Sequence, residues 1–208
     1  MRFGAAIYAV VLAAGLACGL LGCGAPIDPT PNRAPSSAGS YPAGPYGYAS
    51  GSVIANLGFI GKSAPAATDY TPLPMQALGL GDLRANGTKL ILIEGAARWC
   101  VYCNQDQPAM KQLEATYGPR GVVTLEVLAE GTYGVTATED DINRWTARNM
   151  LSGTIVIDPE RQLDKYADVN AYPLYMIVRA SDMQIEYMAT GGMSAAPVGP
   201  VLDMLLAQ

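Results

Sequence analysis

The sequence predicts an α/β domain with a central mixed β-sheet and helices on both faces. Strand-like and helix-like segments alternate between residues 89 and 158, which is typical of parallel strands joined by crossover helices. Two more strand-like segments flank a short turn, which predicts an antiparallel pair, and a helix-like segment follows. The 208 residues, 50% hydrophobic and 15% charged, are enough for one globular domain with modest additions.

The predicted elements follow in order along the chain. After a lead-in with weak strand character over 53–89, the apolar run Lys89–Glu94 suits a central strand, and Cys103–Tyr117 has apolar residues at helical spacing. A strand at 122–128 precedes a helix over 138–150, which a capping box opens. The remaining elements are a strand, a short helix, two strands and a final helix, at 154–158, 163–167, 174–179, 183–189 and 200–207.

The N-terminus has the features of a bacterial signal peptide. A short basic start precedes an apolar stretch, residues 4–21, and Leu20-Leu21-Gly22-Cys23 resembles the bacterial lipobox. We therefore predict that residues 1–22 are removed and that Cys23 carries a lipid, which anchors the exported protein on the periplasmic side of a bacterial membrane. Gly24 rather than an aspartate follows, which favours the outer membrane in a Gram-negative source. An ordinary signal peptide or a membrane anchor is the alternative.

Residues 23–52 are predicted to comprise the lipidated cysteine and a disordered tether. Proline, glycine, serine and alanine are abundant in this stretch, and nothing in it is periodic. Tyr41, Tyr46 and Tyr48 are interpreted as solvated linker residues, with docking to a partner as the alternative. The folded domain is then expected to span residues 53–208.

Charge and residue counts exclude several classes of function. The formal net charge is −5 and no basic cluster is present, so nucleic acid is not an expected partner. The chain contains no histidine, which excludes Ser-His and Cys-His catalysis and haem attachment through Cys-x-x-Cys-His. A zinc site needs about four ligands, and the predicted domain offers two cysteines, so we predict neither a metal nor a cofactor.

The two cysteines of the predicted domain point to redox chemistry. Of the four cysteines, Cys18 leaves with the signal peptide and Cys23 is lipidated, so Cys100 and Cys103 remain. They lie at a predicted strand-to-helix junction, where one helical turn brings both sulfurs within bonding reach. A Cys100–Cys103 disulfide closes almost no loop and adds little stability. Thiol–disulfide exchange therefore explains the pair better than a structural bond or half of a metal site.

These residues resemble the thioredoxin superfamily. Trp99-Cys100-Val101-Tyr102-Cys103 is similar to its Trp-Cys-x-x-Cys signature, and Pro108 is similar to the proline that kinks its active-site helix. Tyr172-Pro173 is similar to its cis-proline, and Glu94 occupies the place of its buried acid. The resemblance runs from residue 68 onward, and the lead-in and an added helix and strand resemble the membrane-tethered TlpA/ResA type. It implies a thioredoxin-like fold.

The resemblance also implies a role for each cysteine. Cys100, at the helix start and the more exposed of the two, would form a mixed disulfide with the substrate, and Cys103 would resolve it. Glu94 would accept the proton of Cys103 during resolution. The alternative for Glu94 is a strand-end carboxylate turned to solvent beside Arg98.

Three further residues are expected around the disulfide. Trp99 would shield it and contact substrate, with simple packing as the alternative. A cis bond before Pro173 would present the backbone of Tyr172 to an extended substrate. A trans proline that precedes a strand is the ordinary alternative.

The expected function is that of a monomeric, lipid-anchored thiol–disulfide oxidoreductase. Its substrates would be exported cysteine-containing proteins, apocytochrome c among them, and a membrane electron donor would keep it reduced. Val101-Tyr102 departs from the dipeptide of thioredoxin, which leaves the redox potential and the direction of electron flow open. A copper(I)-binding or delivery module is the alternative, since two thiolates suit that soft ion. A peroxidase is a third option, although Ala97-Arg98-Trp99 lacks the Thr-x-x-Cys pattern.

Overall fold

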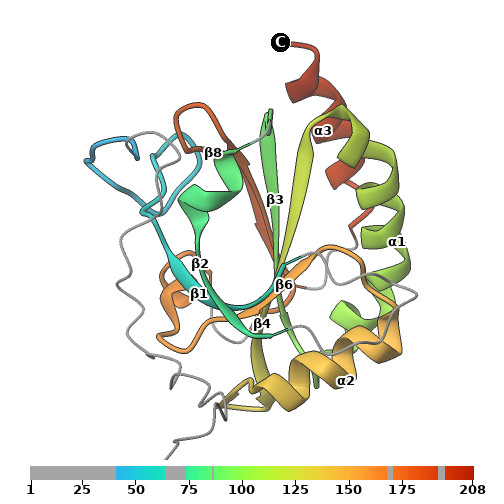
Figure 1. The fold of residues 1–208 in the computed structure, drawn as a ribbon. Coiled ribbons are helices and arrows are strands. Elements are labelled where there is room, and N and C mark those ends of the chain that lie inside the picture. The colour runs from blue at the N-terminus through green and yellow to red at the C-terminus, as the bar shows by residue number, and fades with distance from the viewer. Residues whose placement is uncertain (1–40, 64–73, 86, 168–170, 192–194) are drawn as a thin grey trace, which may run out of the picture.

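The computed structural model describes most of the chain after residue 40 (Figure 1). The described ranges are 41–63, 74–85, 87–167, 171–191 and 195–208. The predicted signal peptide and the predicted lipidation site at Cys23 lie outside them. Within these ranges, no helix combines the length and the apolar character needed to cross a membrane.

The described residues build one mixed β-sheet of eight strands. The strands are β1 Gly58–Lys62, β2 Gln76–Gly79, β3 Leu90–Ala97, β4 Val122–Thr132, β5 Val135–Thr136, β6 Thr154–Ile157, β7 Leu174–Arg179 and β8 Gln184–Thr190. Their order across the sheet is β2-β1-β6-β4-β3-β7-β8, with β5 paired to β4 outside this path. The centre, β6-β4-β3, is parallel, and the flanking strands join it antiparallel. The sheet is therefore mixed, as the sequence predicted.

Long helices cover one face of the sheet. They are α1 Val101–Tyr117, α2 Glu139–Asn149 and α3 Val198–Leu206. The chain passes from β3 through α1 to β4, and from β4 through α2 to β6, each time in the same direction across the sheet. Because such crossovers are right-handed, both helices fall on the same face. Val198 and Leu202 of α3 pack with Met110 of α1 and Leu92 of β3, so α3 covers this face as well (Figure 1).

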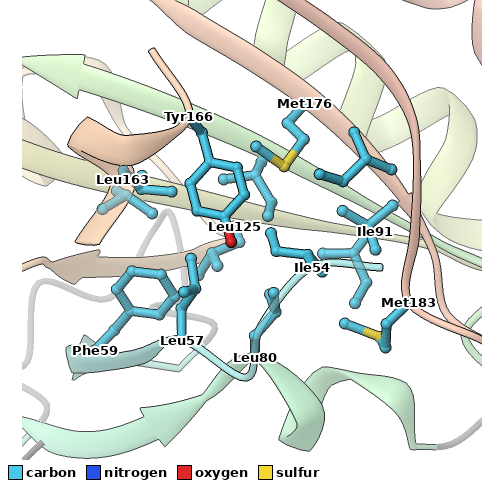
Figure 2. Packing of buried hydrophobic residues seen from close by; sticks show 14 of the residues in the cluster. Ile54, Leu57, Phe59, Leu80, Ile91, Leu125, Leu163, Tyr166, Met176 and Met183 are labelled. Carbon is cyan, nitrogen blue, oxygen red and sulfur yellow. The ribbon is translucent and has the colours of Figure 1, made fainter. Parts of the chain in front are cut away.

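The opposite face carries two 3-10 helices, η1 Leu80–Arg84 and η3 Gln162–Lys165. Leu80 and Leu163 from these helices pack with Ile91 of β3 and Leu125 of β4 in one hydrophobic cluster (Figure 2). Tyr166, which follows η3, closes the cluster from the same side. Helical segments thus lie on both faces, but only short ones lie on this face.

The chain before β1 also belongs to the ordered domain. The hydroxyl of Tyr41 donates to Ile54 O over 2.9 Å, and Gly51 N donates to Ile185 O over 2.8 Å. Residues 41–52 were assigned to the tether because proline, glycine and serine are common in them. Tyr41 packs against the core, and the ring centroid of Tyr48 lies 5.1 Å from that of the buried Tyr166, although Tyr46 and Tyr48 are about half exposed. The ordered domain therefore begins earlier than the sequence predicts.

The lead-in to β3 differs most from the sequence prediction. Weak strand character and turns were expected, whereas β1 and β2 form an antiparallel pair at one end of the sheet. β1 also pairs with β6, and at Gly61 these two strands are so close that an added Cβ would lie 2.2 Å from Ile155 O. The pairing of β1 with β6 joins segments distant in the chain, and no local pattern reports it.

The other predicted elements are present with shifted ends. The strand predicted at 122–128 continues to Thr132, and the helix predicted from Cys103 begins at Val101. The predicted capping box opens α2, since Thr138 Oγ1 accepts from Asp141 N over 3.3 Å and Thr138 N donates to the Asp141 carboxylate over 2.9 Å. The extension of β4 past residue 128 bears on the site, because it brings Glu130 within hydrogen-bond distance of Trp99, which precedes Cys100.

Candidate active site

Cys100 and Cys103 lie where β3 ends and α1 begins. They form a disulfide with an S–S distance of 2.11 Å and a Cα–Cα distance of 5.3 Å. Cys100 retains 3% exposure, whereas Cys103 is fully buried. Cys100 is therefore the sulfur that lies nearer to solvent.

The first turn of α1 is arranged to support a negative sulfur at Cys100. Cys100 is the N-cap residue, and Cys103 N donates to its Sγ over 3.0 Å. Asn104 holds the preceding loop, because its Nδ2 donates to Cys100 O over 2.7 Å and to Arg98 O over 3.2 Å. Unpaired N–H groups at a helix N-terminus favour an anion. When the disulfide opens, the same N–H group would stabilise a thiolate at Cys100.

Trp99 is held beside the disulfide by Glu130 at the end of β4. Trp99 Nε1 and Gly134 N each donate to Glu130 Oε2 over 2.8 Å, and Arg161 donates to Oε1 over 2.7 Å. Burial alone would raise the pKa of Glu130, but these donors outweigh it and the net shift is downward. The charged carboxylate therefore holds the indole in place.

Exposed apolar side chains surround the cysteine pair. Val101 and Tyr102, between the cysteines, are 64% and 56% exposed. Tyr133 is 64% exposed, and its ring centroid lies 5.0 Å from that of Trp99. Exposed apolar surface of this kind is typical of a contact site for another molecule.

The peptide bond between Tyr172 and Pro173 is cis. It directly precedes β7, which runs antiparallel to β3 and begins where β3 ends. Tyr172 belongs to the same buried cluster as Cys100 and Cys103, and its ring centroid lies 6.3 Å from that of Trp99. Residues far apart in the sequence thus meet around the disulfide.

Glu94 is fully buried on the face of β3 that α1 covers. Gln107 Nε2 donates to both of its carboxylate oxygens, over 3.1 and 3.3 Å. The interpretation of Glu94 as a solvent-facing group beside Arg98 is wrong, because Arg98 instead pairs with Asp141, with Nε 2.9 Å from Oδ1. Gln107 follows Cys103 by one helical turn, so Glu94 lies beneath the turn of α1 next to the buried cysteine.

Two further buried acids accompany Glu94, and the sequence analysis missed both. Glu126 of β4 is directly opposite Glu94 in the strand register, and Asp106 of α1 accepts from the Tyr175 hydroxyl over 2.7 Å. Burial, and then the charge of Glu126, raise the pKa of Glu94 well above its usual value, against a hydrogen bond from Gln107 that lowers it. An acid inside an otherwise apolar strand is the signal that could have found Glu126.

The strand order and the cysteine pair at the start of α1 define a thioredoxin-like fold. Solved structures share this fold. A Chlorobium tepidum protein assigned as a thiol:disulfide interchange protein, DsbE, matches with a TM-score of 0.60 at 18% identity, over 77% of this chain and 99% of its own. The fold predicted from the resemblance is confirmed.

Two other solved structures share the fold. The pneumococcal exposed lipoprotein thioredoxin Etrx1 from Streptococcus pneumoniae has a TM-score of 0.52 at 18% identity, over 72% of this chain and 99% of its own. Mycobacterium tuberculosis AhpC has a TM-score of 0.58 at 16% identity, over 76% of this chain and 92% of its own. No protein-family model and no curated protein matches the chain.

Proposed function

We propose that the protein is an exported thiol–disulfide oxidoreductase in which Cys100 captures protein substrates and Cys103 releases them. The observation that carries this proposal is the position of the disulfide, with Cys100 at the N-cap of α1 and an N–H group directed at its sulfur. That environment lowers the cost of a thiolate. A disulfide that only stabilised the fold would gain nothing from it.

The proposed reaction runs in the reducing direction. The Cys100 thiolate attacks a substrate disulfide, the substrate S–S bond breaks, and one substrate sulfur leaves as a thiolate that takes a proton. Cys103 then gives its proton to Glu94, attacks Cys100 Sγ and displaces the second substrate sulfur as a thiolate. Two electrons pass from the cysteine pair to the substrate, and a membrane electron donor restores the dithiol.

The surface around the cysteines supports substrates that present a disulfide on an extended, apolar segment. Val101, Tyr102 and Tyr133 offer exposed apolar contacts, and the backbone of Tyr172 is proposed to pair with an extended substrate. Exported cysteine-containing proteins, apocytochrome c among them, are the proposed substrates, and the enzyme is proposed to act as a monomer. A lipid at Cys23 is proposed to hold it at the membrane, and the exposed lipoprotein thioredoxin of Streptococcus pneumoniae, which shares the fold, supports this proposal.

Insulin reduction by dithiothreitol tests the exchange activity. The wild-type protein is expected to accelerate precipitation of the insulin B chain, and Cys100→Ser to abolish the acceleration. Cys103→Ala should leave mixed disulfides on Cys100, which mass spectrometry of trapped partners identifies. Cys23→Ser is the matched control: it also loses one sulfur, and it should keep the activity while losing the lipid. Wild-type rates in Cys100→Ser would overturn the proposal.

Peroxide is a necessary second substrate in this test, because a 2-Cys peroxiredoxin from Plasmodium vivax shares the fold. Reduced wild-type protein that consumes hydrogen peroxide but leaves insulin intact would favour a peroxidase. Copper(I) titration of the reduced protein covers the remaining alternative. Tight stoichiometric binding without insulin reduction would favour a copper module.

A further inference from the structure

The strongest unexplained feature is a pair of buried glutamates under α1. Glu94 and Glu126 are opposite each other on the neighbouring parallel strands β3 and β4, which places their side chains on the same face. Adjacent strands lie about 4.8 Å apart, so the two carboxyl groups are close neighbours. Glu94 is fully buried and Glu126 is 8% exposed.

Hydrogen bonds hold this pair in place from the helices above it. Gln107 Nε2 of α1 donates to both oxygens of Glu94, and Trp145 Nε1 of α2 donates to Glu126 Oε1. Gln107 Oε1 is buried and accepts no hydrogen bond from the described residues. That oxygen is therefore free to accept from a protonated carboxyl group.

No cation described here neutralises the pair. The ionisable groups that face it are Asp106 and Glu114 of α1 and Tyr175 of β7, all of which are acids. Lys111 of α1 lines the same small cavity as Glu126 but forms no ion pair with either glutamate of the pair. Nor do the described residues form a cluster that could hold a metal ion. Two negative charges in this position would repel each other in a poorly solvated site. The pair with one shared proton therefore has a lower free energy than the doubly charged pair.

Water can reach the Glu126 side of the pair. A cavity of about 20 Å³ is lined by Glu126, by Glu114 and Met110 of α1 and by Gly153 before β6. This volume is sufficient for a single water molecule. Glu94 has no exposed surface, so Glu126 is the member of the pair through which a proton can exchange with solvent.

The pair lies beneath the turn of α1 that follows the buried cysteine. Gln107 follows Cys103 by one turn of α1, and both point at the sheet. Ala96 follows Glu94 by two residues on the same face of β3, and it packs in one cluster with Cys100 and Cys103. The face of β3 therefore runs directly from the cysteines to the acids.

We propose that Glu94 and Glu126 act as one acid pair that shares a proton and takes a second one from Cys103 during resolution. Glu94 is the member near the thiol, and Glu126 positions the shared proton and passes the second one to water in the cavity. This proposal rests on the proposed exchange function. In the step itself, the Cys103 S–H bond breaks and its proton joins the pair. The Cys100–Cys103 bond forms, and the substrate sulfur leaves with the electron pair of the broken mixed disulfide.

The titration of the two carboxyl groups tests the pair without any need for activity. Heteronuclear NMR of the oxidised Cys23→Ser protein, labelled in its glutamate side chains, follows both carboxyl carbons against pH. We expect Glu94 and Glu126 to report the same two steps, because coupled groups titrate together. In Glu126→Gln, Glu94 should titrate in one step that lies between them. Glu114→Gln, the matched control, should retain both steps. An unchanged Glu94 titration in Glu126→Gln would overturn the pair.

The kinetics of resolution test the link to Cys103. Reduced protein reacts with 5,5′-dithiobis(2-nitrobenzoate) in two phases, attack by Cys100 and then resolution by Cys103, each of which releases one coloured thiolate. Replacing both Glu94 and Glu126 by glutamine should slow the second phase about 100-fold and leave the first unchanged. A second phase as fast in the double variant as in the wild type would overturn the link between the acid pair and Cys103. Absence of both phases in the wild type would instead overturn the proposed function. The NMR titration would still test whether Glu94 and Glu126 share a proton, because it does not depend on activity.

Discussion

Replacing Glu126 by glutamine is expected to make the oxidised protein more stable than the wild type at neutral pH. Burial raises the pKa of Glu126 from its usual 4.5 to about 7, against hydrogen bonds from Trp145 and Gln107 that lower it. Between these two values the unfolded chain has lost the proton while the folded protein keeps it. The folded state then binds more protons, so the free energy of unfolding falls as pH rises through this range.

The size of the effect follows from the shift. One pKa unit corresponds to about 1.4 kcal/mol. The shift from 4.5 to about 7 therefore removes about 3 kcal/mol from the free energy of unfolding of the wild type by pH 8. Glutamine does not ionise, and its side chain keeps an oxygen for Trp145 Nε1. Between about pH 4 and pH 8, the difference between variant and wild type should grow by about 3 kcal/mol in favour of the variant.

Urea unfolding at a series of pH values, followed by tryptophan fluorescence, measures this difference. The oxidised protein is used so that the cysteines do not titrate. Glu160→Gln is the matched control, because it makes the same carboxyl-to-amide change at an exposed position. If the free energies of unfolding of Glu126→Gln and the wild type changed equally with pH from 4 to 8, Glu126 would have the same pKa in the folded and unfolded states. That result would refute the reasoning.

Three further changes test the site and the fold. Glu130→Gln weakens the hold on Trp99 and should lower kcat/KM for insulin reduction about ten-fold, whereas an unchanged value would mean that the indole is not held for substrate. Gly61→Ala should lower the free energy of unfolding by about 3 kcal/mol in urea, because its Cβ would lie 2.2 Å from Ile155 O; wild-type stability would contradict the close approach of β1 and β6. Tyr41→Phe should cost about 1 kcal/mol through a lost hydrogen bond, and no change would show that this segment leaves the domain in solution.

The elements that were predictable are those with a local pattern. Apolar runs mark β3 and β7, helical spacing marks α1, and the capping box at Thr138 marks the start of α2. Each of these signals lies within a few residues of the element it predicts. β1 and β2 have only weak strand character in the sequence, and their place in the sheet depends on β6, which lies far along the chain.

The candidate site divides in the same way. Cys100, Cys103 and the proline at 173 follow recognisable motifs, and the structure places them together at the end of β3. Glu130 and Arg161 have no motif, and they join the site only because β4 extends to Trp99 and η3 folds back toward it. Their contribution could not be read from spacing, since it depends on contacts between separate elements.

The chain by itself predicted the chemistry: a cysteine pair at a strand-to-helix junction, in a protein without histidine, favours thiol–disulfide exchange for the domain. Tertiary structure alone decided how protons are handled. Glu94 and Glu126 are ordinary acids in separate strands until β3 and β4 pair in register, and only then does burial beneath α1 make them one proton-sharing unit. The physical reason is that the Cys-x-x-Cys spacing is a local pattern that the sequence displays directly, whereas the pKa of a buried carboxyl group is set by the groups that the fold packs around it.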